Sequence, residues 1–429
     1  MSELQESFSN ISFRFSKRNN SDTTKGDSTR RTLTTTNHVV KTYKLRWLIL
    51  TVICLINMTN TINWICFSSI ADYTGKYYGV DYTQVNFLSI VSMIIAIPAS
   101  LLSFIVIDYF GIRLSLNIAG WLNFMGTLLR VVSSIEQSNG KSLISKDYKY
   151  SVLLIGQIVI SLGGPFAFLV TTKFAQTWFT ENQRARANTV ALSSATFGVL
   201  IGSVLSPFIV NNEKNYAHEM FILNMITSAL SLIPAILAIF INRSAPLTPP
   251  SLSVHNDLLN NDSNKNINNT DSQKRLTFGE NFRIYFQQVG KLLKSLQFLF
   301  LLVSFSLGYG LFNTLATLLQ QILCVRGYTD SDVGIFGGIM ISSGIVGSLI
   351  SGIIVDKTKR FEETAKICFC MSCVANIFFT IIQEYNNDDK FIKYSIITAF
   401  CLVGFFGLPL LPVSIFIHQS FMFLYLVNF

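Results

Sequence analysis

Charged side chains are scarce in this chain. Asp, Glu, Lys and Arg make up 13% of the 429 residues, and the chain holds 4 His. Ten apolar stretches occupy most of the sequence, and none of them carries an acidic residue in its middle. So little charge, beside a hydrophobic share of 50%, argues against a soluble core of this size. Any site inside the apolar part must therefore rely on neutral polar and aromatic groups.

The ten stretches predict membrane-spanning helices. A helix needs roughly 20 apolar residues to cross ~30 Å of hydrocarbon, because every backbone N–H and C=O must be bonded within the segment. An all-α, polytopic membrane protein is the predicted fold class. The stretches are 47–69, 86–107, 114–135, 151–172, 188–210, 220–241, 297–323, 333–355, 367–383 and 394–417.

Catalytic and metal-binding motifs are also scarce in the sequence. The four His lie in tails, loops or helix ends, and no Ser/His/Asp arrangement, phosphate loop or zinc helix can be assembled from them. Cys370 and Cys373 form one Cys-x-x-Cys pair, with no second pair and no His nearby, so helix packing explains them better than a metal or redox site. We expect no enzyme activity, no metal and no cofactor.

The excess of basic residues is placed unevenly. Numbering the loops from a cytosolic N-terminus puts 24 of the 33 Lys and Arg on the cytosolic side and 8 on the other, with Arg130 inside the third stretch. The 24 acidic residues divide as 13 and 11. This is the positive-inside bias of membrane proteins, and it needs no nucleic-acid partner. The N-terminus is predicted to be cytosolic, in a multi-pass protein of the plasma membrane or an endomembrane.

Two polar segments divide the chain. Residues 1–45 are rich in Ser, Thr, Asn and Arg, and residues 243–290 contain an Asn/Asp/Ser-rich run. Neither can bury enough apolar surface to fold alone, so we predict a cytosolic tail and a cytosolic linker. They flank a six-helix bundle over 46–242, and a four-helix bundle over 291–417 precedes a divergent tail over 418–429.

The two bundles repeat one charged corner. The second stretch ends in Asp108, with Gly111 and Arg113 following, and the eighth ends in Asp356 and Lys357. A carboxylate followed by a cation at the same corner of each half is what a gate would use to hold helix ends together in one state. The alternative is that helix ends generally carry charge.

Together with the spacing, these corners resemble the major facilitator superfamily. Within it, several stretches resemble the feline leukaemia virus subgroup C receptor-related family, also called solute carrier 49, and most nearly its orphan branch. The resemblance runs from about Tyr43 to about Val413 and implies a twelve-helix, two-bundle transporter with alternating access, whose relatives carry choline, ethanolamine or haem-related cargo. The stretches are 63–65, 86–89, 120–123, 177–179, 183–188, 318–324 and 355–359.

The last part of the chain departs from that pattern. From Tyr394 to Phe429 the sequence is almost unbroken and apolar, too long for one helix and too short for two with a loop. We therefore expect about ten of the twelve helices, with the eleventh and twelfth missing.

Polar side chains form a stripe on two of the predicted helices. Such stripes face either a cavity or a neighbouring helix to which they hydrogen-bond, and the sequence leaves both open. The spacing of i, i+3 or i+4, and i+7 places each set on one helix face. The members are Asn57, Asn60 and Trp64 on the first helix and Asn313, Thr317, Gln320 and Gln321 on the seventh.

Trp64 is the strongest candidate for a substrate contact. An indole face attracts a cation within about 6 Å, and quaternary ammonium groups are frequent ligands of such faces. The resemblance implies the same contact for Trp64, although the Tyr that completes the cage in relatives is Asn313 here and a Gln on the fifth helix is Thr196. An interfacial or packing role for Trp64 is the alternative.

The scarcity of buried titratable groups also bears on energetics. Coupled carriers place a carboxylate, His or Arg at bilayer depth, and here only Arg130 and Lys173 come close, both near helix ends from which they can snorkel to the interface. We predict a facilitative uniporter for a small amine. Haem transport is an alternative, with no His on the pathway to bind the iron. A receptor-like, non-transporting membrane protein is another, and the oligomeric state stays open.

Overall fold

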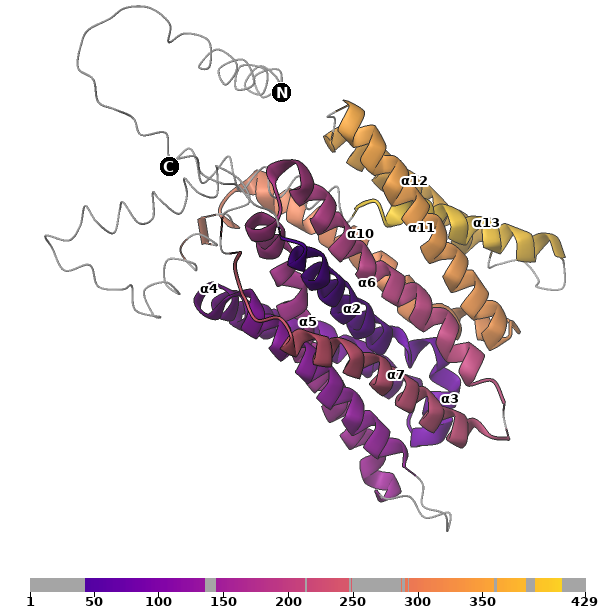
Figure 1. Ribbon diagram of the computed structural model, residues 1–429. Helices are drawn as coiled ribbons and strands as arrows, with labels where there is room; N and C mark the ends of the chain where they lie inside the picture. The colour runs from indigo at the N-terminus through magenta and orange to yellow at the C-terminus, as the bar shows by residue number, and fades with distance from the viewer. Residues whose placement is uncertain are drawn as a thin grey trace, which may run out of the picture. The chain divides into compact units, whose positions relative to one another are not determined.

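The computed structural model describes residues 43–135, 144–212, 214–246, 248, 287, 290–291, 293–358, 361–382 and 390–410. Every regular element in these ranges is helical, which confirms the predicted all-α class (Figure 1). The first half contains α2 (Leu45–Ile65), the 3-10 helix η1 (Ser68–Ile70), α3 (Ala71–Tyr78), α4 (Tyr82–Ser134), α5 (Lys146–Trp178), α6 (Glu181–Ile209) and α7 (Tyr216–Ile239). The second half contains α10 (Leu296–Cys324), α11 (Asp330–Thr358), α12 (Phe361–Ile382) and α13 (Lys390–Gly407).

Nine of the ten predicted stretches lie on these helices, apart from a few terminal residues, and the tenth, 394–417, lies on α13 up to Gly407, with 411–417 outside the described residues. Eight helices are long and apolar enough to cross a membrane, and α13 is a shorter apolar helix. Helix α4 is 53 residues long and contains two of the predicted stretches. The predicted tails 1–45 and 418–429, apart from the few residues next to α2, and most of the predicted linker lie outside the described residues.

A glycine separates the two parts of α4. Gly111 has a φ of 81°, in the left-handed region that side chains with a Cβ rarely adopt. A Cβ there would lie 2.9 Å from Oγ of Ser244, and the backbone N–H of Arg113 donates to that same hydroxyl at 3.3 Å. The corner between the second and third predicted spans therefore requires glycine for both conformation and space.

Helix α2 is packed among the other helices of the first half. It contacts α4, α5, α6 and α7, and its residues Ile49, Ile53 and Ile56 are buried in the largest apolar cluster. Small residues allow the close approach of α6: a Cβ at Gly198 would lie 2.1 Å from Thr61 Oγ1, and one at Gly202 would lie 2.5 Å from Ile65. Such packing of small residues is typical of helices in membranes.

In the second half, α13 packs against both α11 and α12. Phe336, Phe379 and Phe400 form the centre of its apolar cluster. The two halves belong to one unit, Val40–Phe429, and α11 lies beside α6 across the boundary between them (Figure 1).

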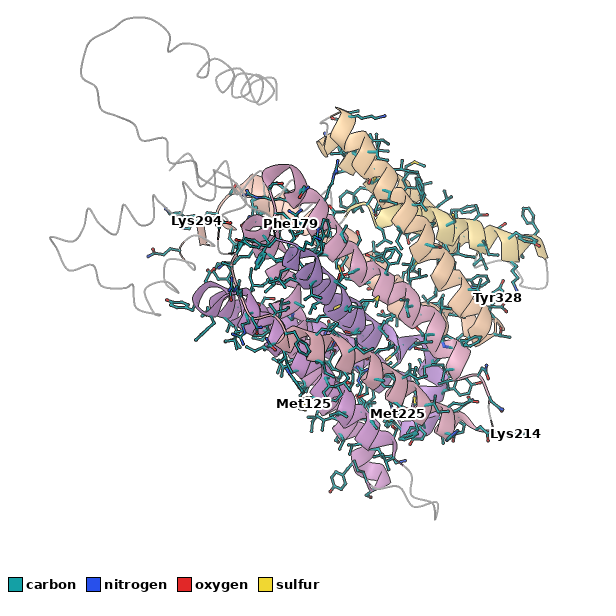
Figure 2. All side chains as sticks on the ribbon, viewed as in Figure 1. Met125, Phe179, Lys214, Met225, Lys294 and Tyr328 are labelled. Carbon is teal, nitrogen blue, oxygen red and sulfur yellow. The ribbon has the colours of Figure 1, made fainter. Side chains whose placement is uncertain are left out.

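The residues labelled in Figure 2 mark the two ends of the set of long helices. At one end lie Phe179, between α5 and α6, and Lys294, just before α10. We call it the linker end, because Ser244, at the start of the predicted linker, accepts a hydrogen bond there from Nε1 of Trp178, next to Phe179. At the other end lie Lys214, between α6 and α7, and Tyr328, between α10 and α11, and we call it the far end.

Candidate functional site

The contacts between the halves gather at the far end. There the last two turns of α6 meet the first turns of α11. A Cβ at Gly334 would lie 3.4 Å from Pro207, one at Gly337 would lie 3.7 Å from Ser203, and one at Gly338 would lie 3.2 Å from Val204. Helix α10 also contacts η1 and α4. The surfaces that meet are thus small and apolar.

One pair of amides joins the halves by hydrogen bonds. Asn86, in the first turns of α4, donates from Nδ2 to Oε1 of Gln321 at 3.1 Å, and Gln321 donates from Nε2 to Oδ1 of Asn86 at 2.7 Å. Both side chains are half-buried, and Gln321 lies one turn before the end of α10. These two side-chain hydrogen bonds cross between the halves, so the halves are held together at the far end.

Two members of the polar stripe on α2 bond to neighbouring helices. Asn57 is buried and donates to the carbonyl of Ala191 on α6 at 3.3 Å. Asn60 is half-buried and donates to the carbonyl of Ile160 on α5 at 3.2 Å. A Cβ at Gly164 would lie 2.9 Å from Oδ1 of Asn60. These contacts hold α2 in place, while Asn60 keeps part of its side chain accessible.

Trp64 differs from its neighbours on the stripe. Its ring is half-buried, and no hydrogen bond to its indole is present among the described residues. The adjacent Asn63 is fully buried and donates to Oδ1 of Asn123 at 3.2 Å and to Oγ of Ser231 at 3.1 Å. Thr196, on α6, is half-buried one residue after Ala195, whose carbonyl accepts Thr61. Trp64 thus offers an accessible ring on a firmly held backbone.

The predicted members on α10 form a second group. Asn313 is half-buried and hydrogen-bonds with the Tyr309 side chain. Thr317 donates to the carbonyls of Asn313 at 2.9 Å and Thr314 at 3.1 Å, and Gln320 is 1% exposed. The structure therefore divides the predicted substrate residues into one group on α2 and α6 and another on α10.

The α-helix of the first span gives way to a 3-10 turn just after Trp64, while Cys66 and Phe67 keep αR angles. Helix α2 ends at Ile65, η1 occupies 68–70, and Ile70 has the non-helical angles φ −132° and ψ 43°. Arg130, on the second part of α4, reaches this point. Its Nη2 donates to the carbonyl of Asn63 at 2.8 Å, its Nη1 lies 3.5 Å from Sγ of Cys66, and its guanidinium carbon lies 4.8 Å from the centre of the Phe67 ring.

The Arg130 guanidinium is fully buried, with an exposed fraction of 0%. It also donates to Oε1 of Gln157 on α5, and Gln157 in turn donates to Oγ of Ser92 at 2.8 Å. The ion pairs found among the described residues do not include it. The sequence predicted that this side chain would snorkel to the interface, and the structure instead buries it among neutral groups of the first span and α5.

At the linker end, Asp108 forms an ion pair with Lys173 on α5. The sequence suggested Arg113 as the cation, and the structure uses that residue's backbone N–H to bond Ser244. In the second half, Lys357 is exposed in the last turn of α11, and the side chain of Asp356 lies outside the described residues. The predicted gate is thus described in the first half only.

Three contacts of the structure were not predictable from the sequence. The motif at 86–89 and the Gln320/Gln321 pair were noticed, but nothing in one sequence indicates that residues 235 positions apart bond each other. Arg130 stood out as a lone cation in an apolar stretch, which was the available signal of a buried role. The sequence places Lys173 at the inner end of its stretch, but it does not indicate that Asp108 is its ion-pair partner.

The chain matches the Major Facilitator Superfamily model over residues 53–426, which continues past Val413, where the sequence motifs stop. Solute carrier family 49 member A3 of Xenopus tropicalis is 30% identical over 380 residues, which are 87% of this chain and 71% of that protein. The Danio rerio protein of the same name is 31% identical over 373 residues, 87% of this chain and 71% of that one. Choline/ethanolamine transporter FLVCR2 of Rattus norvegicus is 26% identical over 380 residues, 88% of this chain and 63% of that protein.

Solved structures show the same fold. The crystal structure of a D-xylose-proton symporter aligns with a TM-score of 0.61 at 14% identity, covering 84% of this chain and 80% of the other. The partially occluded, inward open xylose transporter XylE of E. coli gives 0.59 at 13% identity, covering 88% of both chains. This chain therefore belongs to the solute carrier 49 family of the major facilitator superfamily, which makes it a multi-pass membrane transporter and not an enzyme.

Proposed function

We propose that this protein is a facilitative uniporter of a small amine, choline-like or ethanolamine-like, that works by alternating access. Within the family, the identities of 30% and 31% favour the member A3 branch over FLVCR2 at 26%. FLVCR2 is a choline/ethanolamine transporter, and those solutes supply the substrate class as a hypothesis for this chain. We further propose that residues 1–45 and 243–290 are a cytosolic tail and linker, which makes the linker end cytosolic.

The observation that carries the proposal is the accessibility of the Trp64 side chain. Its ring is partly accessible and makes no hydrogen bond among the described residues, while Asn60, one turn earlier, also remains partly accessible. An aromatic face with neutral polar groups nearby can hold a quaternary ammonium without a carboxylate, through a cation–π contact worth roughly 2 kcal/mol when desolvated. Asn57, Thr196, Asn313, Thr317 and Gln320 complete the proposed site from both halves.

The closed far end supports alternating access. The Asn86–Gln321 amides and the glycine face of α11 hold the halves together there. Opening toward the far side requires those contacts to separate while the linker end closes. We propose that Asp108 with its partner Lys173, Gly111 and Arg113, together with Asp356 and Lys357 in the other half, shape that linker-end gate.

We infer uniport from where the carboxylates lie, and we assign the buried Arg130 a positioning role, argued below, in place of a coupling role. Carboxylates of the described spans stand in the first turns of helices (Asp72, Glu219, Asp332, Glu363), at the Gly111 corner (Asp108) or in the last turn of α11 (Asp356). A carboxylate that bound a coupling ion would be expected near mid-span. We infer that the solute moves down its own gradient.

The experiment is uptake of labelled choline and ethanolamine by cells expressing the protein. Trp64→Ala should weaken affinity about five- to thirtyfold, the loss of a cation–π contact of roughly 1 to 2 kcal/mol, and Trp64→Phe should lose less because a smaller ring face remains. Trp47→Ala is the matched control, since Trp47 lies on the same helix at the linker end and is 54% exposed. Transport of neither solute, or parental affinity in both Trp64 variants, would overturn the proposal.

A further inference from the structure

The positively charged guanidinium of Arg130 is buried, and no carboxylate among the described residues pairs with it. Such an arrangement needs a physical explanation. Its side chain is 0% exposed, and its acceptors are a backbone carbonyl, an amide oxygen and a thiol sulfur. Its Nε has no acceptor among the described residues. Burying a charge inside a membrane protein is costly, and such residues persist chiefly where they serve function.

The contacts of the guanidinium concentrate on one short segment. Asn63, Cys66 and Phe67 lie at the transition from α2 to η1, which we call the break; Cys66 and Phe67 keep αR angles, and the first non-helical angles come at Ile70. The Cys66 N–H donates to the carbonyl of Ile62, and the next carbonyl, that of Asn63, accepts the Arg130 guanidinium. The last carbonyls of a helix lack backbone partners and carry partial negative charge. Arg130 therefore donates to a carbonyl that lacks a backbone partner, and the partial negative charge at the end of α2 offsets the positive charge of the guanidinium.

Trp64 lies inside this segment, between Asn63 and Cys66. Contacts of the residues before and after Trp64 therefore fix the position of its backbone. The Asn63 side chain is anchored to Asn123 and Ser231, and Arg130 holds the carbonyl of Asn63 and the ring of Phe67. A side chain that bonds into the i→i−4 ladder is one of the identifiable causes of a helix break.

We propose that Arg130 is a positioning residue: it fixes the break in the first span and thereby the orientation of the Trp64 ring. The importance of that orientation for substrate rests on the proposed function, whereas the orientation itself does not. A purely structural role would predict loss of folding with no specific effect at Trp64.

The test uses Arg130→Lys, which keeps the charge and removes the planar fork that reaches several acceptors at once. The protein has 4 Trp, so labelling with 5-fluorotryptophan gives a small set of ¹⁹F resonances, and Trp64→Phe assigns the one of interest. In folded, monodisperse Arg130→Lys, the Trp64 resonance should move while that of Trp47, at the linker end, stays in place. A Trp64 resonance that coincides with the parent's would overturn the proposal.

Asn224→Ala is the matched control. Asn224 is buried on α7 and donates to the backbone carbonyl of Arg130 at 3.4 Å and to Oγ of Ser134 at 3.1 Å, without touching the guanidinium or the break. It should lower thermal stability and leave the Trp64 resonance unchanged. If Arg130→Lys does not fold, Phe67→Leu removes the cation–π contact from the other side, and it should move the Trp64 resonance in the folded protein.

Uptake then separates positioning from general damage. Arg130→Lys should raise KM about tenfold with kcat within about twofold of the parent, and it should add nothing to KM in a Trp64→Ala background, because it acts through that ring. Independent, multiplicative effects on KM would overturn the proposal. If the parent carries neither choline nor ethanolamine, the proposed substrate fails, and the fluorine spectra still decide whether Arg130 positions Trp64.

Discussion

Removing the amide pair between the halves is expected to open the far end. In Asn86→Ala or Gln321→Ala, two reciprocal hydrogen bonds of 3.1 and 2.7 Å disappear. The remaining amide is half-buried and can be hydrated once the halves separate, so each bond contributes a net ~1 kcal/mol, or about 2 kcal/mol for the pair. That corresponds to a roughly thirtyfold shift in the equilibrium. A far-end-open population of about 1% would rise to about 25%.

Pulsed electron spin resonance can measure this shift. Spin labels at Lys214 and at Val325, which is 89% exposed, report the distance between the halves at the far end. The exposed native thiols of Cys370 and Cys373 are first changed to Ser so that they do not react. The long-distance component should grow in either Ala variant.

The double variant should resemble each single one, because the two side chains bond each other. Asn376→Ala is the matched control, since that amide bonds the Ser372 carbonyl of its own helix at 2.8 Å. Unchanged distances in both single variants, or additive changes in the double variant, would refute the idea that this pair holds the far end closed.

Three further outcomes are expected. An epitope inserted near Asn264, outside the described residues, should be inaccessible to impermeant reagents on intact cells; labelling from outside would reverse the proposed topology. Asp108→Asn should slow turnover with nearly unchanged substrate affinity, and the opposite pattern in uptake kinetics would remove Asp108 from the gate. Gly111→Ala should destabilise the protein by about 1–2 kcal/mol, since φ is 81° and Oγ of Ser244 blocks a Cβ; an unchanged melting temperature would contradict this.

The helices were predictable because the bilayer imposes a simple length rule. As far as the structure describes them, the ten stretches lie on helices, and even the join inside α4 falls at Gly111, which the repeated corner had already singled out. Backbone hydrogen bonds within each helix depend on local sequence alone, so periodicity and length suffice. The family followed from motifs, which are local as well.

The site was less predictable because it depends on which helix faces touch. A polar stripe reads the same whether it lines a cavity or bonds a neighbour. The structure shows that Asn57 bonds α6 and Asn60 bonds α5, which leaves Trp64 as the accessible member. The partners of Asp108 and Arg130 lie on other spans and could not be inferred from spacing. Their roles in substrate binding and gating stay predictions.

The glycine face of α11 has a mechanical consequence. Where Gly334, Gly337 and Gly338 meet α6, the contact rests on small apolar groups, and no hydrogen bond crosses it among the described side chains. Rotation there re-forms similar van der Waals contacts at each angle, so little energy opposes it. The amide pair, by contrast, must break in a single step. We therefore expect the axis of any rotation between the halves to run along α6 and α11, with Asn86 and Gln321 travelling farther from it.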